Sequence, residues 1–185
     1  MPNTTTAIAS IQDLLGCWRT MGSRRLRSGA ELIAEVPDGE RDMWMHAVFP
    51  GQSAAKLDQL EVALGKPLPK RLRAFYRGCG GMTLFMGAFT LHGIRRPGFR
   101  GRDGSLEPEC VVELNHLLDM LGWLPDDAVA FACNGWDGSV FVLGMGQNDK
   151  EVVRCERSSG AIIERYEDVF SCVDARLYHL DDLLS

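Results

Sequence analysis

Four short apolar segments in the last third of the chain constrain its fold more than any other feature. They cover residues 128–133, 139–143, 151–156 and 161–166. The first two are joined by an Asn-Gly-Trp-Asp-Gly run at 134–138, and Asn-Gly and Asp-Gly supply the positive φ angles that tight hairpins need. Segments of this length, separated by turn residues, predict antiparallel strands that are neighbours in a sheet.

Apolar residues recur at helical spacing in five other segments, which we predict to be helices. These segments are 7–21, 54–64, 69–77, 109–121 and 167–184. Ser53 precedes the second helix as an N-cap, and Gly65 follows it as a helix stop. Short apolar runs at 82–86 and 89–91 predict two further strands. Because this order is not a regular alternation of strand and helix, it predicts an α+β fold with a largely antiparallel or mixed sheet covered by helices.

A Pro-Gly pair at 50–51 interrupts the chain and marks a division. Residues 1–49 are expected to form an N-terminal helix and an extension packed on the domain. Within them, 22–29 is basic and turn-like, and 43–49 is a candidate strand. Residues 50–185 are expected to form the α+β domain itself. The whole length of 185 residues suits one globular unit.

Hydropathy and cysteine spacing indicate the setting in which the protein works. No stretch is apolar for the roughly 20 residues that cross a bilayer, and residues 1–10 lack the basic start and apolar run of a signal peptide. The six cysteines are scattered without a Cys-x-x-Cys pair, and the four histidines are isolated, so neither disulfides nor a zinc site are indicated. We therefore expect a cytoplasmic protein with reduced thiols, no metal and no cofactor.

Charge is spread unevenly along the chain. Residues 1–104 carry 15 Lys/Arg and 9 Asp/Glu, a formal charge of +6, whereas residues 105–185 carry 5 and 16, a formal charge of −11. If folding keeps the two parts separate, one face is strongly acidic, which speeds association with a basic partner and repels nucleic acid. If folding interleaves them, the asymmetry has no consequence.

The sequence contains no constellation that is typical of an enzyme. It has neither a Gly-x-Ser-x-Gly nucleophile elbow nor a Walker-type phosphate loop. Cys79, within a Gly-Cys-Gly-Gly run, is a candidate nucleophile, but nothing in the sequence places a particular histidine beside it. The neighbouring carboxylates at 126–127 and 181–182 are best interpreted as solvated surface groups. We expect no catalytic residue and no enzymatic activity.

A basic loop is the best candidate for contact with nucleic acid. Four arginines lie around Phe99 in this loop: Arg95, Arg96, Arg100 and Arg102. Arginines near an aromatic ring can hold phosphates while the ring stacks on a base. One short loop is a weak signal in a chain with a pI near 5.4, so a solvated loop is the preferred interpretation.

Trp136 is the most informative single residue. It lies at the tip of the hairpin predicted for 134–138, where an exposed tryptophan would be a hot spot for a protein partner. The alternative is that its side chain folds back and covers the core. Three acidic residues in this part of the chain are the other candidates for contact with a partner, namely Asp137 and the pair Asp126 and Asp127.

Residues 50–91 carry a distinctive motif. It reads Leu60-Glu61-x-x-Leu64-Gly65-x-x-Leu68-Pro69, then Leu72-x-x-Phe75-Tyr76, then Gly80-Gly81. This motif resembles the opening signature of the SUKH superfamily (Smi/Knr-type domains), in which a helix ends in Leu-Gly, an extended Leu-Pro link follows, and a second helix leads to a Gly-Gly turn. The later order of elements is also similar. The chain departs from the family pattern at Cys79, where asparagine is frequent, and residues 1–49 have no counterpart.

The resemblance implies a SUKH-like fold and a function in binding proteins. Many bacterial members of that superfamily are immunity proteins, which bind and neutralise toxins, often nucleases or deaminases, delivered between competing cells. Others are interaction scaffolds, including regulators of cell-wall synthesis in fungi. We therefore expect a non-catalytic immunity protein with Trp136, Asp137, Asp126 and Asp127 facing its toxin. An intracellular regulatory scaffold of the same fold, and an anion or nucleic-acid binder acting through the Arg95–Arg102 loop, are the alternatives.

Overall fold

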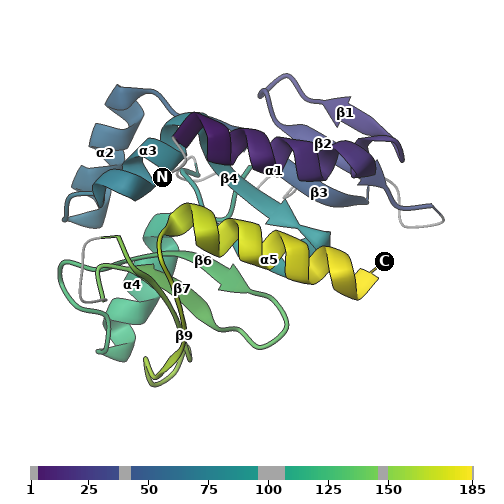
Figure 1. Ribbon diagram of the computed structural model, residues 1–185. Helices are drawn as coiled ribbons and strands as arrows, with labels where there is room; N and C mark the ends of the chain where they lie inside the picture. The colour runs from purple at the N-terminus through teal and green to yellow at the C-terminus, as the bar shows by residue number, and fades with distance from the viewer. Residues whose placement is uncertain (1–3, 38–42, 96–106, 146–149, 185) are drawn as a thin grey trace.

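The computed structural model describes residues 4–37, 43–95, 107–145 and 150–184. A sheet forms the centre of the molecule, and helices pack on both of its faces (Figure 1). This architecture confirms the α+β class predicted from the sequence. Within the described residues, no helix combines the length and the apolar character needed to span a membrane.

Nine strands pair in the order in which they occur along the chain. They are β1 (Ser23–Arg25), β2 (Glu31–Glu35), β3 (Trp44–Pro50), β4 (Cys79–Leu84), β5 (Phe89–Leu91), β6 (Val129–Asn134), β7 (Val140–Leu143), β8 (Val152–Cys155) and β9 (Ile162–Tyr166). Each strand pairs antiparallel with the next, so the sheet is a meander with β1 and β9 at its edges. The four strands predicted in the last third of the chain are β6 to β9, as expected.

Five α-helices and one 3-10 turn complete the regular structure of the described residues. They are α1 (Thr4–Arg19), α2 (Ala54–Leu64), α3 (Lys70–Gly78), η1 (Phe85–Gly87, the 3-10 turn), α4 (Val111–Leu121) and α5 (Val169–Leu184). α1 and α5 lie side by side over one face of the sheet (Figure 1). α4 covers the opposite face, where Leu114 and Leu118 belong to a cluster with Val140 and Val142 of β7. All five predicted helices are present, with ends shifted by a few residues.

The ends of α2 show how single residues fix these elements. Ser53 is the N-cap, and its side chain accepts a hydrogen bond from the backbone N–H of Lys56 at 3.4 Å. Gly65 ends the helix with a φ of 71°, a left-handed conformation that glycine adopts without the cost of a Cβ. The structure confirms both predicted roles.

In the Gly-Gly run of the motif, a Cβ on Gly80 would lie 2.3 Å from the carbonyl oxygen of Pro50, so only glycine fits where β4 meets β3.

The region before residue 50 contributes three strands to the sheet. Residues 22–29 were expected to be turn-like, and this expectation is wrong for 23–25, which form β1. All three residues of β1 are exposed, so the strand has no buried alternation by which sequence periodicity could reveal it. Its arginines suit an edge strand, because charge at an edge discourages pairing with other chains. β3 runs across the division at residue 50, and the sheet is continuous there.

One buried amide joins α4 to the sheet. Asn115 is 1 % exposed, and its Nδ2 donates to the carbonyl oxygens of Val111 at 2.8 Å and Ala130 at 2.7 Å. The backbone N–H of Ala130 donates to Asn115 Oδ1 at 3.1 Å. Ala130 lies where the register between β6 and β7 shifts. The Asn115 side chain therefore satisfies both backbone polar groups of a buried residue at a bulge.

Candidate functional site

Two turns lie together at one end of the sheet. η1 joins β4 to β5, and residues 135–139 join β6 to β7. The backbone N–H of Gly135 donates to the carbonyl oxygen of Ala88 at 3.0 Å. A Cβ on Gly135 would lie 2.2 Å from the carbonyl oxygen of Gly87, so this close approach of two backbones requires glycine. The two turns are therefore packed as one unit.

The substitution Gly135→Ala tests this contact. The added methyl group would collide with the Gly87 carbonyl, and overpacking typically costs about 1–3 kcal/mol. We expect the free energy of unfolding, measured in urea, to fall by that amount. Gly16→Ala is the matched control, because a Cβ at Gly16 of α1 meets nothing within 4 Å and alanine favours helices. If the two substitutions had the same effect, the contact would not be important.

Each of the two turns presents a large apolar side chain to solvent. Met86 of η1 is 53 % exposed, and Trp136 is 60 % exposed, so the structure shows the exposed alternative for this tryptophan. Phe85 and Met86 have φ angles of 49° and 55°. Residues other than glycine adopt this left-handed conformation at a cost of about 1–3 kcal/mol each, and such strain is often found at functional sites. Here the left-handed conformation of both residues accompanies a buried Phe85 side chain and an exposed Met86 side chain.

Charged and polar side chains hold the turn that carries Trp136. Arg154 of β8 forms an ion pair with Asp137 and donates from Nε to Ser139 Oγ at 2.8 Å. Its Nη1 also lies 3.4 Å from Glu164 Oε2 on β9. Burial raises the pKa of Asp137, but hydrogen bonds from Ser139 and Arg154 outweigh it and hold that pKa below its ordinary value. The carboxylate therefore stays charged and fixes the turn to the neighbouring strands.

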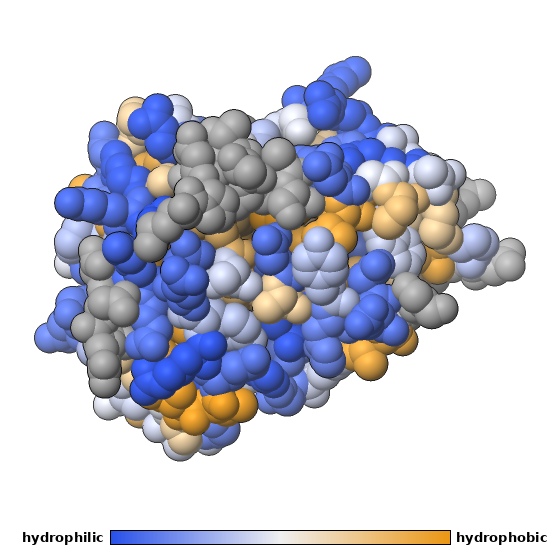
Figure 2. All heavy atoms as spheres, viewed as in Figure 1, coloured by the Kyte–Doolittle hydropathy of each residue, from blue (hydrophilic) through white to orange (hydrophobic). Residues whose placement is uncertain are grey.

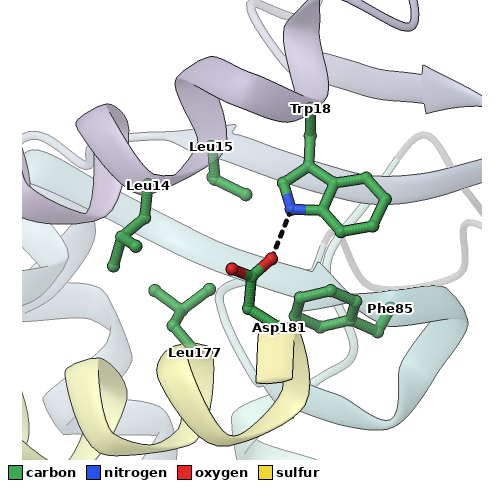
Figure 3. A pocket seen from close by; sticks show the side chains of 6 residues that line it. All are labelled: Leu14, Leu15, Trp18, Phe85, Leu177 and Asp181. Atoms are coloured by element: carbon green, nitrogen blue, oxygen red, sulfur yellow. Dashed lines mark hydrogen bonds between the residues drawn. The ribbon is translucent and has the colours of Figure 1, made fainter. Parts of the chain in front are cut away.

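A notch with apolar walls lies beside η1, between α1 and α5 (Figure 3). The residues that line it are Leu14, Leu15, Trp18, Phe85, Leu177 and Asp181. Trp18 Nε1 donates to Asp181 Oδ1 at 3.0 Å. The notch is shallow and has no room for even a water molecule, so it is not a small-molecule site. We call this notch, together with the exposed residues Met86, Trp136 and Asp137, the η1 surface.

His46 of β3 lies behind the notch and supports it. Its ring contacts Trp18 and Phe85 edge to face, with ring centroids 5.2 and 4.6 Å away. The backbone N–H of Phe85 is 3.4 Å from His46 Nδ1, so this nitrogen is the acceptor and Nε2 carries the proton. Nε2 has no hydrogen-bond partner among the described residues. Burial lowers the pKa of His46 to about 4, although the charge of Asp181 opposes the change.

This buried histidine predicts that the protein loses stability in mild acid. Because the pKa of His46 is about 4 in the folded state and 6.5 ordinarily, the unfolded chain takes up the proton first as pH falls. The stabilisation is complete above about pH 6.5 and is lost progressively down to about pH 4. Urea unfolding should show a loss of about 2 kcal/mol from this residue between about pH 7 and pH 5. His46→Gln should flatten this dependence, whereas exposed His179→Gln should leave it unchanged; equal slopes in both variants would refute the assignment.

The structure brings together only some of the residues that the sequence singled out. Trp136 and Asp137 lie on the η1 surface. Asp126 and Asp127 are exposed in the turn that precedes β6, at the opposite end of that strand. Six residues of extended chain separate the two ends, a distance of about 20 Å at roughly 3.3 Å per residue. The four predicted contact residues therefore do not form one site.

Neither Cys79 nor Cys133 has the environment of an activated nucleophile. Cys79 is 3 % exposed, and burial raises its pKa to about 11. Its thiol donates to the carbonyl oxygen of Gly81 at 3.3 Å. A different cysteine is near a histidine: Cys133 Sγ lies 3.3 Å from His92 Nε2. Burial raises the pKa of Cys133 and lowers that of His92 to about 4, so both stay neutral, the reverse of a reactive thiolate–imidazolium pair.

The basic loop that the sequence singled out lies mostly outside the described residues. Arg95 lies in the described chain, whereas Arg96, Arg100 and Arg102 of the basic loop lie outside the described residues. In the part of the chain that the structure describes, no group of three or more His, Cys, Asp or Glu side chains could hold a metal ion.

Sequence reasoning missed Trp18, Phe85 and Asp181, because only the fold brings them together. Trp18 and Asp181 are 163 positions apart in the chain. One signal was present: two aspartates occupy the last turn of a helix, where the helix dipole disfavours negative charge.

An antiparallel α+β meander, covered by α1 and α5 on one face, therefore carries two exposed large apolar side chains, Met86 and Trp136, on neighbouring turns. No protein-family model matches the chain, and no curated protein sequence matches it. The resemblance to the SUKH superfamily stays a prediction.

Proposed function

We propose that this chain is a cytoplasmic, non-catalytic immunity protein that binds and neutralises a bacterial toxin through the η1 surface. The observation that carries the proposal is the pair of exposed apolar side chains, Met86 and Trp136, on two turns that are fixed to one another. A large exposed aromatic side chain on a rigid turn is the arrangement that anchors protein interfaces.

The rigidity of the turn favours tight binding. The turn is closed by a hydrogen bond from the Gly138 N–H to the Asn134 carbonyl at 2.9 Å, and Asp137 is paired with Arg154. Binding therefore orders few additional groups, and less conformational entropy is lost. Tryptophan is also among the residue types most enriched in interface hot spots.

The charges around this surface favour a basic partner. Asp137 belongs to the surface, Asp181 lines its notch, and Asp182 is the next, exposed residue of α5. The strand order separates residues 23–91 from 129–166, but these carry 10 Lys/Arg with 7 Asp/Glu and 4 Lys/Arg with 5 Asp/Glu, so most of the acidic excess of residues 105–185 lies outside the strands, as in α5. Complementary charge would steer a basic toxin, such as a nuclease or deaminase, toward this surface.

The choice of a toxin as the partner rests on the SUKH resemblance, in which immunity proteins are frequent. A regulatory scaffold would use the same surface, and the identity of the partner distinguishes the two functions. An immunity gene normally lies beside the gene for its toxin.

Co-expression with neighbouring genes tests the proposal. Each gene adjacent to the one for this chain would be expressed in host cells, with and without the chain, while growth is measured. We expect one neighbouring product to arrest growth and the chain to restore it. If every neighbour is harmless, or if growth arrest persists when the chain is present, the immunity proposal fails and the scaffold alternative gains support.

A further inference from the structure

The two edges of the sheet differ in their chemistry. β1, at one edge, reads Ser-Arg-Arg, and its arginines discourage pairing with another chain. β9, at the other edge, begins with two isoleucines, of which Ile162 is 43 % exposed and Ile163 is 51 % exposed. An edge strand with exposed apolar side chains is a template to which another chain can add a strand. β9 is therefore the edge that is open to association.

The exposed apolar side chains of β9 lie together. Every residue from 161 to 165 is exposed. Figure 2 shows an apolar patch at the lower margin of the visible face, where Figure 1 places β9, with hydrophilic surface around it. Ile163 has no opposite residue on β8, because the register shifts between Arg154 and Cys155, and a bulge of this kind leaves its extra residue outside the ladder. The Ile163 side chain is therefore available to a residue of another chain.

The charges on β9 do not oppose the approach of a second β9. Glu164 and Arg165 have opposite signs, so residues 161–165 carry no net charge. Glu164 accepts a hydrogen bond from the hydroxyl of Tyr166 at 2.6 Å. Arg165 is paired with Glu151 at 2.9 Å. Two β9 strands can therefore meet without an accumulation of like charge, whereas two β1 strands would bring four arginines together.

Pairing of β9 with its own copy closes after two chains. A two-fold axis uses the same surface of both copies, so no β9 edge stays free, whereas pairing of β9 with β1 would continue into a filament. An axis at Ile163, the middle residue of the exposed run, places this residue beside its own copy. Glu164 then lies opposite Ile162 of the other copy. Arg165 lies opposite Ala161, so no like charges face one another across the strands.

We propose that two copies of this chain associate through antiparallel pairing of their β9 strands about an axis at Ile163. The pairing joins the two sheets into one and covers the apolar patch. Because only residues 161–165 of each copy take part, the interface is smaller than that of a stable dimer, and association is weak and concentration-dependent. The inference goes beyond the proposed function and needs no toxin, so failure of one is distinguishable from failure of the other.

Sedimentation equilibrium of the full chain tests the inference. Concentrations from roughly 10 µM to 1 mM suit an interface of this size. A reducing agent is included, because Cys17 is exposed and could form a disulfide between chains. We expect the weight-average mass to rise from 20.5 kDa toward twice that value and no further. A chain that is monomeric at the highest concentration, or that grows beyond a dimer, would overturn the inference.

Two matched variants assign the association to β9. Ile163→Lys places two like charges at the axis, and we expect it to raise the dissociation constant at least about tenfold. Val62→Lys is the control, because Val62 of α2 is an 83 % exposed branched side chain far from β9 in the fold, and we expect a change of less than about twofold. Circular dichroism would confirm that both variants are folded. Equal effects of the two substitutions would contradict the proposal.

Hydrogen exchange followed by mass spectrometry locates the surface directly. In the unaltered chain, we expect the amides of residues 161–166 to exchange more slowly at high concentration than at low concentration, because a second strand covers them. The amides of β1 should exchange at the same rate at both concentrations. If exchange of β9 did not depend on concentration while the mass rose, another surface would form the dimer and the proposal would be wrong.

Discussion

Trp136→Ala should weaken binding of the neutralised toxin at least about 30-fold, equivalent to about 2 kcal/mol or more. The indole is 60 % exposed in the free protein and would be covered in the complex. Its removal leaves the turn intact, because the ion pair of Asp137 with Arg154 does not involve the indole. The free energy of unfolding should therefore change by no more than about 0.5 kcal/mol, as for other surface substitutions. Isothermal titration with the purified toxin would measure the binding.

Val62→Ala is the control for this prediction. Val62 of α2 is 83 % exposed and lies outside the η1 surface, so its truncation should leave affinity unchanged. If Trp136→Ala bound the toxin as tightly as the unaltered chain, the η1 surface would not be the binding surface. If both variants lost affinity equally, the loss would not be specific to the η1 surface.

Asn115→Leu should lower the free energy of unfolding by about 3 kcal/mol. The substitution keeps the size of the side chain but leaves the backbone N–H and C=O of Ala130 without the partners that Asn115 provides. Each buried polar group left unsatisfied costs about 1–3 kcal/mol. The cost cannot be relieved by water, since Asn115 and Ala130 are both buried. Urea unfolding followed by circular dichroism would measure it.

His116→Leu is the matched control, because the next residue of α4 is exposed and should tolerate leucine within about 0.5 kcal/mol. A small effect of Asn115→Leu, comparable to that of the control, would show that α4 is held to the sheet by apolar packing alone.

Elements with strong local signals were predictable from the sequence. α2 is an example, because Ser53 and Gly65 fix its two ends by interactions within a few residues. β6 and β7 are another, because the glycines of the connecting turn and the apolar runs on either side are adjacent in the chain. In both cases the physical cause lies within one short segment.

Features that depend on distant contacts were not predictable. β1 has three exposed residues, so only its pairing with β2 makes it a strand. The prediction of four acidic and aromatic contact residues placed Asp126 and Asp127 with Trp136, whereas the sheet holds them at opposite ends of β6. Phe85 has a left-handed backbone conformation, which a phenylalanine in the sequence does not predict.

The most direct test of the central claim is to titrate the activity of the purified toxin, identified by co-expression, with the purified chain. The account predicts that activity falls steadily and reaches its minimum at one equivalent of the chain, because neutralisation occurs by direct binding. Toxin activity that is unchanged at a large excess of the chain would contradict the account.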